Sequence, residues 1–320
     1  MKKNIIIFGG SGCLGKNLIK HYINKDDYNI INYSRDEHKH WKLDNIFGKN
    51  IIKHVIGDAN DNILVKKILT MYNPYYIFII HALKHVDRCQ ENIHSCITTN
   101  LLSVKNVLDC IQENVNYLTN LNTVIFTSTD KAPSPINAYG MCKALCEELI
   151  IEKSKELDKI KFVTVRYGNV INSTSSLLPL LLQNNTDTYY ITDYRMTRFF
   201  MTIQNAIDTI LYAIEYADSG DIIIPIVKSF YIKDMINYVA NLKNKTVQKI
   251  GLRPGERLYE TLINDTQSIR CIKKFNYYHI KPYYKKYNNY SEPFIYDSNT
   301  NIITDSLELE NLLEDIITLK

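Results

Sequence analysis

The chain has 320 residues, of which 45% are hydrophobic and 22% charged, with a formal net charge of +4. This composition is that of a folded globular protein of roughly two domains, and it excludes a largely disordered or collagen-like chain. No apolar run approaches the roughly 18 residues of a membrane-spanning helix, and the apolar stretch near the N-terminus is too short for a signal peptide. We therefore expect a cytoplasmic protein that does not bind membranes.

Basic residues and cysteines are both scattered along the chain. The most basic stretch, 281–286, is interleaved with tyrosines, and we interpret it as a solvated tail rather than a nucleic-acid site. The seven cysteines include no C-x-x-C pair, which argues against a disulfide framework and a zinc site. We expect reduced, mostly buried cysteines, no metal and no nucleic-acid partner.

The first half of the chain alternates between strands and helices. Short apolar runs predict strands at 3–8, 28–33, 53–57, 75–80, 123–126 and 161–165. Helical spacing predicts helices at 14–22, 61–72, 93–115 and 137–157. The alternation predicts an α/β fold, a Rossmann-type doubly wound parallel sheet with helices on both faces. We assign residues 1–170 to this nucleotide-binding domain.

After residue 170 the rhythm changes. The pattern predicts helices at 177–182, 203–216, 232–242 and 307–317, and strands at 189–191, 221–226 and 247–250. From residue 268 to the last helix the chain is rich in tyrosine and is expected to be irregular. We interpret 171–320 as a smaller, mainly substrate-binding region, from which segments at about 199–226 return to the first domain.

A glycine-rich turn follows the first predicted strand and precedes the first predicted helix. Glycines in a G-x-x-G-x-x-G pattern permit a tight turn there, and the helix N-terminus attracts a pyrophosphate. An ordinary glycine turn is the alternative, but the continuing strand-helix alternation favours a dinucleotide. The expected cofactor-binding residues of this turn are Gly9, Ser11, Gly12, Cys13, Leu14 and Gly15.

The end of the second predicted strand indicates which dinucleotide binds. Ser34 and Arg35 precede Asp36, and arginine is the natural partner of a 2′-phosphate, so NADP is favoured over NAD. In the alternative, Arg35 is a surface residue and Asp36 holds the ribose. Asp58, which precedes Ala59, either receives the adenine amino group or caps the helix that follows.

A tyrosine and a lysine stand four residues apart after the fifth predicted strand. Tyr139 and Lys143 therefore share one face of a helix. A free tyrosine has a pKa of about 10, and a lysine ammonium beside it favours the phenolate. The phenolate could take a hydroxyl proton while hydride leaves for a nicotinamide, and Thr129 could hold the substrate oxygen. Y-x-x-x-K is a weak motif alone and a strong one after a glycine-rich fingerprint.

With these motifs the chain resembles the extended short-chain dehydrogenase/reductases. More narrowly, it resembles the UDP-N-acetylglucosamine 4,6-dehydratases, in their soluble, configuration-inverting branch. The matching stretches span most of the chain and are 82–86, 128–132, 135–140, 166–170, 191–193, 196–199 and 253–256. The membrane-anchored, configuration-retaining relatives carry methionine where this chain has Tyr139, so the resemblance implies the inverting branch.

The resemblance also implies roles in catalysis. Tyr139 and Lys143 would drive oxidation at sugar carbon 4, with Thr129 orienting the substrate. Lys131 would remove the carbon-5 proton, and Asp130 would protonate the departing carbon-6 hydroxyl. Hydride would then return to carbon 6, and protonation from the opposite face would invert carbon 5. The alternative for Asp130 and Lys131 is an exposed pair that caps the next helix.

The remaining implied contacts concern the cofactor and the UDP group. Two arginines suit a diphosphate, and a glutamate could accept from ribose hydroxyls. Ala82 is expected at the cofactor, and Lys84 at the cofactor or the substrate. The alternative for 253–256 is an ordinary Pro-Gly loop with a salt bridge. The UDP-binding residues implied by the resemblance are Asn169, Thr197, Arg198, Arg253 and Glu256.

The chain departs from the family pattern at three places. Phe8 replaces a threonine before the glycine motif, and 79–82 reads Ile-Ile-His-Ala instead of His-Ala-Ala-Ala. The loop 172–176 lacks the usual arginine and glycines, and in relatives this loop faces the substrate.

We expect a homo-oligomer that acts on UDP-N-acetylglucosamine or a related UDP-sugar. One alternative is a retaining dehydratase or a 4-epimerase on a related nucleotide sugar, although an epimerase would not need Asp130 and Lys131. The other alternative is a catalytically silent nucleotide-binding protein, against which the intact Tyr139 and Lys143 argue.

Overall fold

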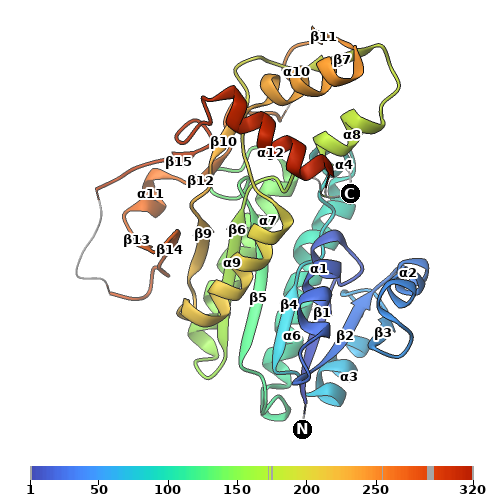
Figure 1. Cartoon of the computed structure of the whole chain (residues 1–320). Coiled ribbons are helices and arrows are strands. Elements are labelled where there is room, and N and C mark those ends of the chain that lie inside the picture. The colour runs from blue at the N-terminus through green and yellow to red at the C-terminus, as the bar shows by residue number, and fades with distance from the viewer. Residues whose placement is uncertain (1, 172, 174–175, 254, 287–291, 319–320) are drawn as a thin grey trace.

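A nine-stranded sheet in the order β13-β14-β9-β6-β5-β4-β1-β2-β3 forms the centre of the molecule (Figure 1). The computed structural model describes residues 2–171, 173, 176–253, 255–286 and 292–318. The parallel strands are β1 (Lys3–Phe8), β2 (Tyr28–Ser34), β3 (Ile52–Ile56), β4 (Tyr76–Ile79), β5 (Thr123–Thr129), β6 (Lys161–Tyr167) and β9 (Ile222–Pro225). The predicted Rossmann-type sheet is confirmed, because the strand order reverses at β1 as in a doubly wound fold.

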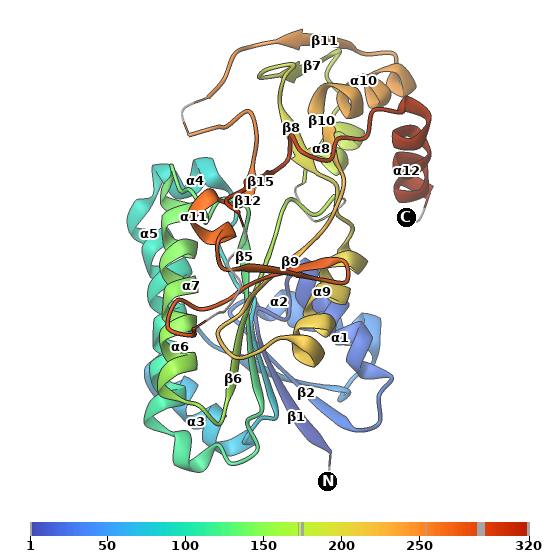
Figure 2. The same ribbon diagram turned by 90° about the vertical axis from the view of Figure 1, so that its left-hand side faces the viewer.

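Helices cover both faces of this sheet (Figure 2). One face packs against α3 (Asn62–Tyr72), α6 (Ser103–Glu113) and α7 (Ala138–Glu156). The other face packs against α1 (Cys13–Ile23), α2 (Glu37–Phe47) and α9 (Ile203–Tyr216). Apart from the edge strand β3, the parallel strands are largely buried, which explains why they read as continuous apolar runs.

Two segments between the strands differ from the prediction. The structure has a helix, α2, at Glu37–Phe47, where none was predicted. The apolar spacing that would have predicted it is missing, because only His40 and Leu43 of this polar segment are buried. The helix predicted at 93–115 is divided, since α5 (Ile93–Ile97) and α6 are joined by a π-helical segment at Thr98–Leu102. The short helix α4 (Val86–Glu91) precedes them, and a single 3-10 turn at Val115–Tyr117 follows.

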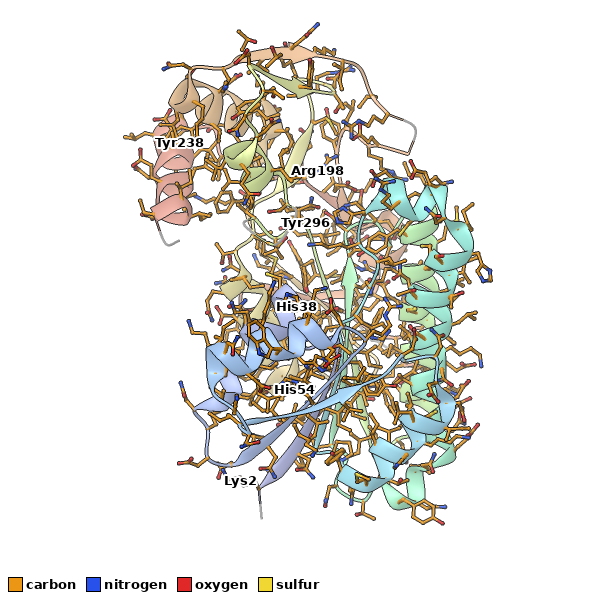
Figure 3. All side chains as sticks on the ribbon, turned by 90° about the vertical axis from the view of Figure 1, so that its right-hand side faces the viewer. Lys2, His38, His54, Arg198, Tyr238 and Tyr296 are labelled. Carbon is orange, nitrogen blue, oxygen red and sulfur yellow. The ribbon has the colours of Figure 1, made fainter. Side chains whose placement is uncertain are left out.

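A smaller lobe stands above the carboxyl ends of the parallel strands (Figure 1). Its helices α8 (Leu177–Gln183), α10 (Ile232–Lys243) and α12 (Ser306–Thr318) enclose a separate apolar core. Its strand pairs are β7 (Thr188–Ile191) with β11 (Thr246–Lys249) and β8 (Thr197–Phe199) with β10 (Ser229–Tyr231). At the junction with the sheet, β12 (Thr261–Ile263) pairs with β15 (Tyr296–Asp297), next to the short helix α11 (Asp265–Ser268). Figure 3 shows Arg198 and Tyr296 in this junction.

The expectation of an irregular chain after residue 268 is wrong. The strands β13 (Cys271–Lys274) and β14 (Tyr277–Ile280) form an antiparallel hairpin, and β14 pairs with β9 of the main sheet. The interpretation of 281–286 as a solvated basic tail is wrong at Lys281. This side chain is buried, and its Nζ atom lies 2.7 Å from Asp221 Oδ2 and 2.8 Å from Asp218 Oδ2. Two carboxylates therefore compensate the buried ammonium.

Two other expectations concern the cysteines and the membrane. All seven cysteines are free thiols; six are buried and Cys13 is half-buried, as predicted. In the part of the chain that the structure describes, none of the helices has the length and apolar character needed to cross a membrane.

Candidate active site

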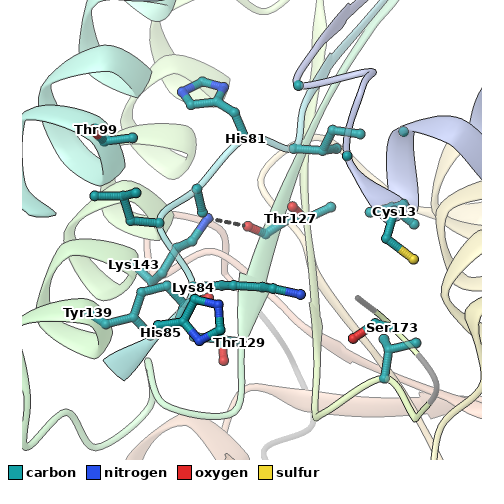
Figure 4. A pocket seen from close by; sticks show the side chains of 18 of the residues that line it. Cys13, His81, Lys84, His85, Thr99, Thr127, Thr129, Tyr139, Lys143 and Ser173 are labelled. Atoms are coloured by element: carbon teal, nitrogen blue, oxygen red, sulfur yellow. Dashed lines mark hydrogen bonds between the residues drawn. The ribbon is translucent and has the colours of Figure 1, made fainter. Parts of the chain in front are cut away.

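A cleft of about 1040 Å³ lies at the carboxyl ends of the parallel strands, between the sheet and the smaller lobe. In an open α/β sheet, this edge next to the reversal of strand order is where ligands bind. The cleft brings together most of the predicted site residues, and Figure 4 shows part of its lining. The predicted residues that line it are Gly9, Ser11, Gly12, Cys13, Leu14, Gly15, Ser34, Arg35, Asp36, Asp58, Ala59, Ala82, Lys84, Thr129, Lys131, Tyr139, Lys143, Asn169, Arg253 and Glu256.

The glycine turn leaves no room for a side chain at two of its positions. Gly9 has φ +96°, and a Cβ atom there would lie 2.9 Å from the His81 Cα. A Cβ atom on Gly15 would lie 2.4 Å from the Gly10 Cα. α1 follows at once, and its N-cap Gly12 offers no side chain to the first N–H groups. These groups face the cleft with the positive end of the helix dipole, so the turn fits the pyrophosphate of a dinucleotide.

The end of the cleft next to β2 and β3 bears on the alternatives for Asp36 and Asp58. Asp36 is the N-cap of α2 and accepts a hydrogen bond from the Lys39 backbone N–H at 3.1 Å. Asp61, and not Asp58, caps α3. Asp58 lines the cleft and lies 3.3 Å from Arg35 Nη1. Lys39 is a second basic residue at this end of the cleft, and sequence reasoning missed it. Its only signal in the sequence was its position one turn into α2, a helix that was itself not predicted.

Tyr139 and Lys143 lie in the first turns of α7 and line the cleft. The Lys143 Nζ atom donates a hydrogen bond to the Thr127 backbone oxygen at 2.9 Å (Figure 4). The expected lowering of the tyrosine pKa is not found: burial raises the pKa of Tyr139 to about 12. The nearby charge of Lys131 and a hydrogen bond with Thr129 oppose this rise without overcoming it.

Asp130 and Lys131 form the centre of a buried network of charges. Lys131 Nζ lies 2.9 Å from Asp130 Oδ1 and 3.1 Å from Oε1 of Glu260, a residue that was not predicted. Burial lowers the pKa of Lys131, but the negative charges of Asp130 and Glu260 outweigh burial and hold this pKa above its usual value. The alternative of an exposed helix-capping pair is wrong, because Asp130 is buried and Asn137 caps α7.

Asp130 lies just beneath the lining of the cleft. Its Oδ1 atom also accepts a hydrogen bond from the Thr129 hydroxyl at 3.0 Å. Its buried Oδ2 atom has no hydrogen-bond partner among the described residues. A carboxyl group with one satisfied and one unsatisfied buried oxygen has the capacity to carry a proton on the second oxygen.

The residues expected at the UDP group separate into two sets. Asn169, Arg253 and Glu256 line the cleft, and the Glu256 carboxylate accepts a hydrogen bond from the Arg253 backbone N–H at 3.1 Å. Thr197 and Arg198 do not line it. Thr197 is fully buried and its hydroxyl is hydrogen-bonded to Ser298, whereas the Arg198 guanidinium donates to the backbone oxygens of Thr197, Arg257 and Leu258. The Arg198 side chain therefore holds the backbone just after Arg253 and Glu256, and the Thr197 side chain is tied to Ser298.

The loop at 172–176 is only partly described. Ser173 and Ser176 line the cleft. The other three residues of this loop, and the proline of the stretch 253–256, lie outside the described residues.

His81 is a further lining residue that sequence reasoning did not assign. It stands where 79–82 departs from the family pattern, and its Nε2 atom lies 2.7 Å from the Ser103 hydroxyl oxygen. Burial lowers the pKa of His81 from 6.5 to about 4, so the imidazole is neutral near pH 7. The departure in sequence was the only signal that could have found it.

Comparison with known proteins places the chain in a family. Residues 5–282 match the family described as "Polysaccharide biosynthesis protein". An inverting UDP-N-acetylglucosamine 4,6-dehydratase of Campylobacter jejuni is 35% identical over 88% of this chain and 83% of its own length. A UDP-glucose 4-epimerase of Rickettsia bellii is 33% identical over 99% of this chain and 96% of its own length.

Solved structures agree with this assignment. The X-ray structure of Pen from Bacillus thuringiensis superposes with a TM-score of 0.89 at 29% identity, covering 100% of this chain and 99% of Pen. A dTDP-glucose 4,6-dehydratase of Bacillus anthracis, in complex with NAD, gives a TM-score of 0.66 at 15% identity over 79% of this chain and 86% of its own, which shows the shared fold. The chain belongs to the polysaccharide biosynthesis protein family, and its resemblance to the inverting UDP-N-acetylglucosamine 4,6-dehydratases is confirmed.

Proposed function

We propose that this protein is an NADP-dependent UDP-N-acetylglucosamine 4,6-dehydratase that also inverts carbon 5. The product is a UDP-2-acetamido-2,6-dideoxy-L-hexos-4-ulose. The observation that carries the proposal is the contact between Asp130 and Lys131 beside Tyr139. Elimination across carbons 5 and 6 needs one base and one acid in addition to Tyr139, whereas oxidation and reduction at carbon 4 need only the tyrosine.

The residues of the cleft fit an NADP cofactor. The glycine turn and the start of α1 would hold the pyrophosphate. Ser34, Arg35 and Lys39 would hold the 2′-phosphate of NADP. Asp36 caps α2, which favours NADP over NAD, because NAD would need this acid to bind its ribose. Asp58 and Ala59 would contact the adenosine, and Ala82 and Lys84 would lie along the middle of the cofactor. NADP would supply a hydride acceptor and a positive ring charge near Tyr139.

The first step needs a proton acceptor at the carbon-4 hydroxyl. Tyr139 would be this acceptor, which is supported by its hydrogen bond with Thr129 and by the charge of Lys131, which acts to lower its pKa. Lys143 is anchored on Thr127 beneath the cleft, and its ammonium adds positive charge to this region. Because burial holds the pKa of Tyr139 near 12, the phenolate depends on positive charges in the assembled site.

The second step removes the carbon-5 proton and the carbon-6 hydroxyl. Lys131 Nζ is within hydrogen-bonding distance of Asp130, so one proton can pass between them and leave a neutral amine beside a carboxylic acid. Lys131 would then take the carbon-5 proton, and Asp130 would give its proton to the leaving hydroxyl. Water departs, and both residues return to their charged forms.

We assign the nucleotide and the substrate to different regions of the chain. Residues 1–170 form the nucleotide-binding domain, and 171–320 mainly form the substrate-binding region. Asn169, Arg253, Glu256 and Lys84 would contact the UDP-sugar, which is supported by their places in the cleft lining. Thr197 and Arg198 would act through the backbone that they hold.

We also propose that the protein is a homo-oligomer. Several large apolar side chains are exposed on α5, α7 and the π-helical segment between α5 and α6, and burial against a second copy would remove them from water. These side chains are Ile93, Ile97, Leu102, Met141 and Leu145.

A 4-epimerase is the second candidate function. It is favoured by the Rickettsia bellii relative named UDP-glucose 4-epimerase, which matches nearly the full length of both chains. Mass spectrometry of UDP-N-acetylglucosamine incubated with the protein and NADP separates the two functions. A dehydratase lowers the mass of the sugar nucleotide by one water, and a 4-epimerase leaves it unchanged. Tyr139→Phe is the control and should abolish either conversion.

A further inference from the structure

Three oxygen atoms surround the Nζ atom of Lys131. Oδ1 of Asp130 lies at 2.9 Å, Oε1 of Glu260 at 3.1 Å and Oδ1 of Asn169 at 3.4 Å. An ammonium group has three N–H donors, so each of these oxygens can accept one of them. Asp130 and Asn169 belong to the predicted site, whereas Glu260 approaches from a segment far along the chain.

Glu260 is fixed in its position. It is 5% exposed and lies just before β12. Its backbone N–H donates a hydrogen bond to the Ser298 hydroxyl oxygen at 3.0 Å, and its backbone oxygen accepts one from the Ser298 N–H at 2.8 Å. The Arg198 Nε atom lies 3.6 Å from its Oε1 atom. We expect a buried carboxylate that is held in this way to stay at the same distance from Lys131 when cofactor and substrate bind in the cleft.

A second, small cavity adjoins this contact. It has a volume of about 10 Å³, and its lining includes Lys131, Glu260, Arg257, Ser134 and Asn137. A cavity of this size has room for about one water molecule among polar partners. Glu260 therefore faces Lys131 from the side of this cavity, while Asn169 faces it from the side of the large cleft.

We propose that Glu260 is a positioning residue for Lys131, fixing its Nζ atom beside Asp130 and making it a stronger base toward carbon 5. This inference rests on the proposed dehydratase function and adds a residue to it. Glu260 touches neither substrate nor cofactor, and it acts through Lys131 alone.

The proton balance shows what the carboxylate contributes. In the reactive form, the proton shared by the pair is on Asp130 and Lys131 is neutral. Lys131 then gains the carbon-5 proton as the C–H bond breaks, and Asp130 loses its proton to the carbon-6 hydroxyl, which leaves as water. Glu260 keeps its negative charge throughout. It raises the basicity of the Lys131 amine toward the carbon-5 proton and keeps the shared proton on the Asp130–Lys131 pair to higher pH.

The charged groups that face Lys131 determine its response to pH. They are Asp130 and Glu260, which favour its charged form, and Arg198, which disfavours it. Tyr139 and Arg257 are the other titratable neighbours. Activity requires one proton on the Asp130–Lys131 pair, so the basic limb of the pH–rate profile reports the loss of that proton.

The test compares Glu260→Gln with wild type. The amide keeps the shape and an acceptor oxygen but removes the charge. We expect the rate of carbon-5 exchange and dehydration to fall about 100-fold. The basic limb of kcat should move at least about one unit to lower pH. Carbon-4 oxidation, followed as reduced nicotinamide in a single turnover, should remain at the wild-type rate.

Two variants and one spectroscopic titration complete the experiment. Glu260→Asp keeps the charge and should return the basic limb toward its wild-type position. Glu152→Gln, on the exposed side of α7, is the matched control and should change nothing. NMR titration of protein labelled with [ε-13C]lysine, with the Lys131 signal assigned from Lys131→Met, reads the Lys131 midpoint without any activity. We expect this midpoint to be lower in Glu260→Gln.

Each outcome bears on one claim. If wild type dehydrates the substrate and Glu260→Gln has the same exchange rate and the same basic limb, the positioning role is overturned. If wild type does not dehydrate the substrate, the proposed function fails and the lysine titration decides the inference alone. An unchanged Lys131 midpoint then overturns it, and a lowered midpoint supports it.

Discussion

The Nζ atom of Lys131 lies 2.9 Å from Oδ1 of Asp130, its neighbour in the chain; the Asp130 side chain is buried and that of Lys131 is half-buried. β5 ends at Thr129, and the chain turns immediately afterwards, so that Lys131 lines the cleft and Asp130 lies just beneath this lining. The base and the acid of the proposed elimination are therefore supplied by adjacent residues. Their contact permits a change from the charged pair to the neutral pair without a proton from solvent.

Replacing Lys131 separates elimination from oxidation. We expect Lys131→Met to lower the rate of dehydration about 100- to 10,000-fold, the usual contribution of a general base. Tyr139 remains, so formation of reduced nicotinamide on mixing with substrate should persist. Stopped-flow absorbance and mass spectrometry measure the two steps, with Lys273→Met on the exposed strand β13 as the control. Equal loss of both steps would contradict the assignment of Lys131 to carbon 5.

Arg35 should discriminate between the two dinucleotides. Its guanidinium is exposed at the end of β2 and paired only with Asp58 among the described residues. We expect Arg35→Ala to weaken NADP binding about 10- to 100-fold, because one charge-assisted contact is lost, and to leave NAD binding nearly unchanged. Calorimetric titration with both cofactors measures this, with Arg88→Ala on α4 as the control. Equal effects on the two cofactors would contradict the 2′-phosphate site.

His81 should make stability depend on pH. Its pKa is about 4 in the folded protein and 6.5 ordinarily, because burial disfavours the charged ring. Between these values the unfolded chain binds the proton and the folded chain does not, so the free energy of unfolding falls as pH decreases from 6.5 to 4. His81→Ala should remove part of this slope in urea unfolding curves, whereas His38→Ala, at an exposed histidine, should not. A slope unchanged in His81→Ala would contradict the burial effect.

A buried ion pair connects β6 to α7, and its arginine also holds the C-terminal segment. Arg166 Nε and Nη2 lie 2.9 and 2.5 Å from the two carboxylate oxygens of Glu147, and Nη1 donates to the Leu262 oxygen at 2.7 Å. Breaking a buried pair leaves one uncompensated charge, which costs about 3–5 kcal/mol. We expect Arg166→Met and Glu147→Leu each to lower the free energy of unfolding by about this amount, and the double variant to lower it by less than the sum. Additive effects would show that the two side chains are not coupled.

The parts of the fold that could be predicted are those whose residues carry a strong local pattern. The buried parallel strands read as apolar runs, and the glycine turn has a spacing that few other structures require. The helix α2 was missed because its polar sequence buries only His40 and Leu43. The hairpin of β13 and β14 was missed because its tyrosines and lysines do not alternate as apolar and polar residues, although β14 is paired on both sides.

The candidate site shows the same limit. Motif positions such as Tyr139 and Lys131 could be assigned because their spacing is local. Glu260 could not, since it follows Lys131 by well over one hundred residues and only folding brings the two side chains to 3.1 Å. Arg198 lies in a matching motif, but its hydrogen bonds are to backbone oxygens and its ion pair is with Glu260, which residue types alone do not indicate.

The most direct test of the account is proton NMR of UDP-N-acetylglucosamine incubated with the purified protein and NADP in deuterated water. The account predicts a new carbon-6 methyl signal, a 4-keto sugar or its hydrate, deuterium at carbon 5 and the L configuration there. A carbon-6 methyl with the D configuration retained would contradict inversion. A sugar changed only at carbon 4, with its carbon-6 hydroxyl intact, would contradict the dehydratase itself and establish a 4-epimerase.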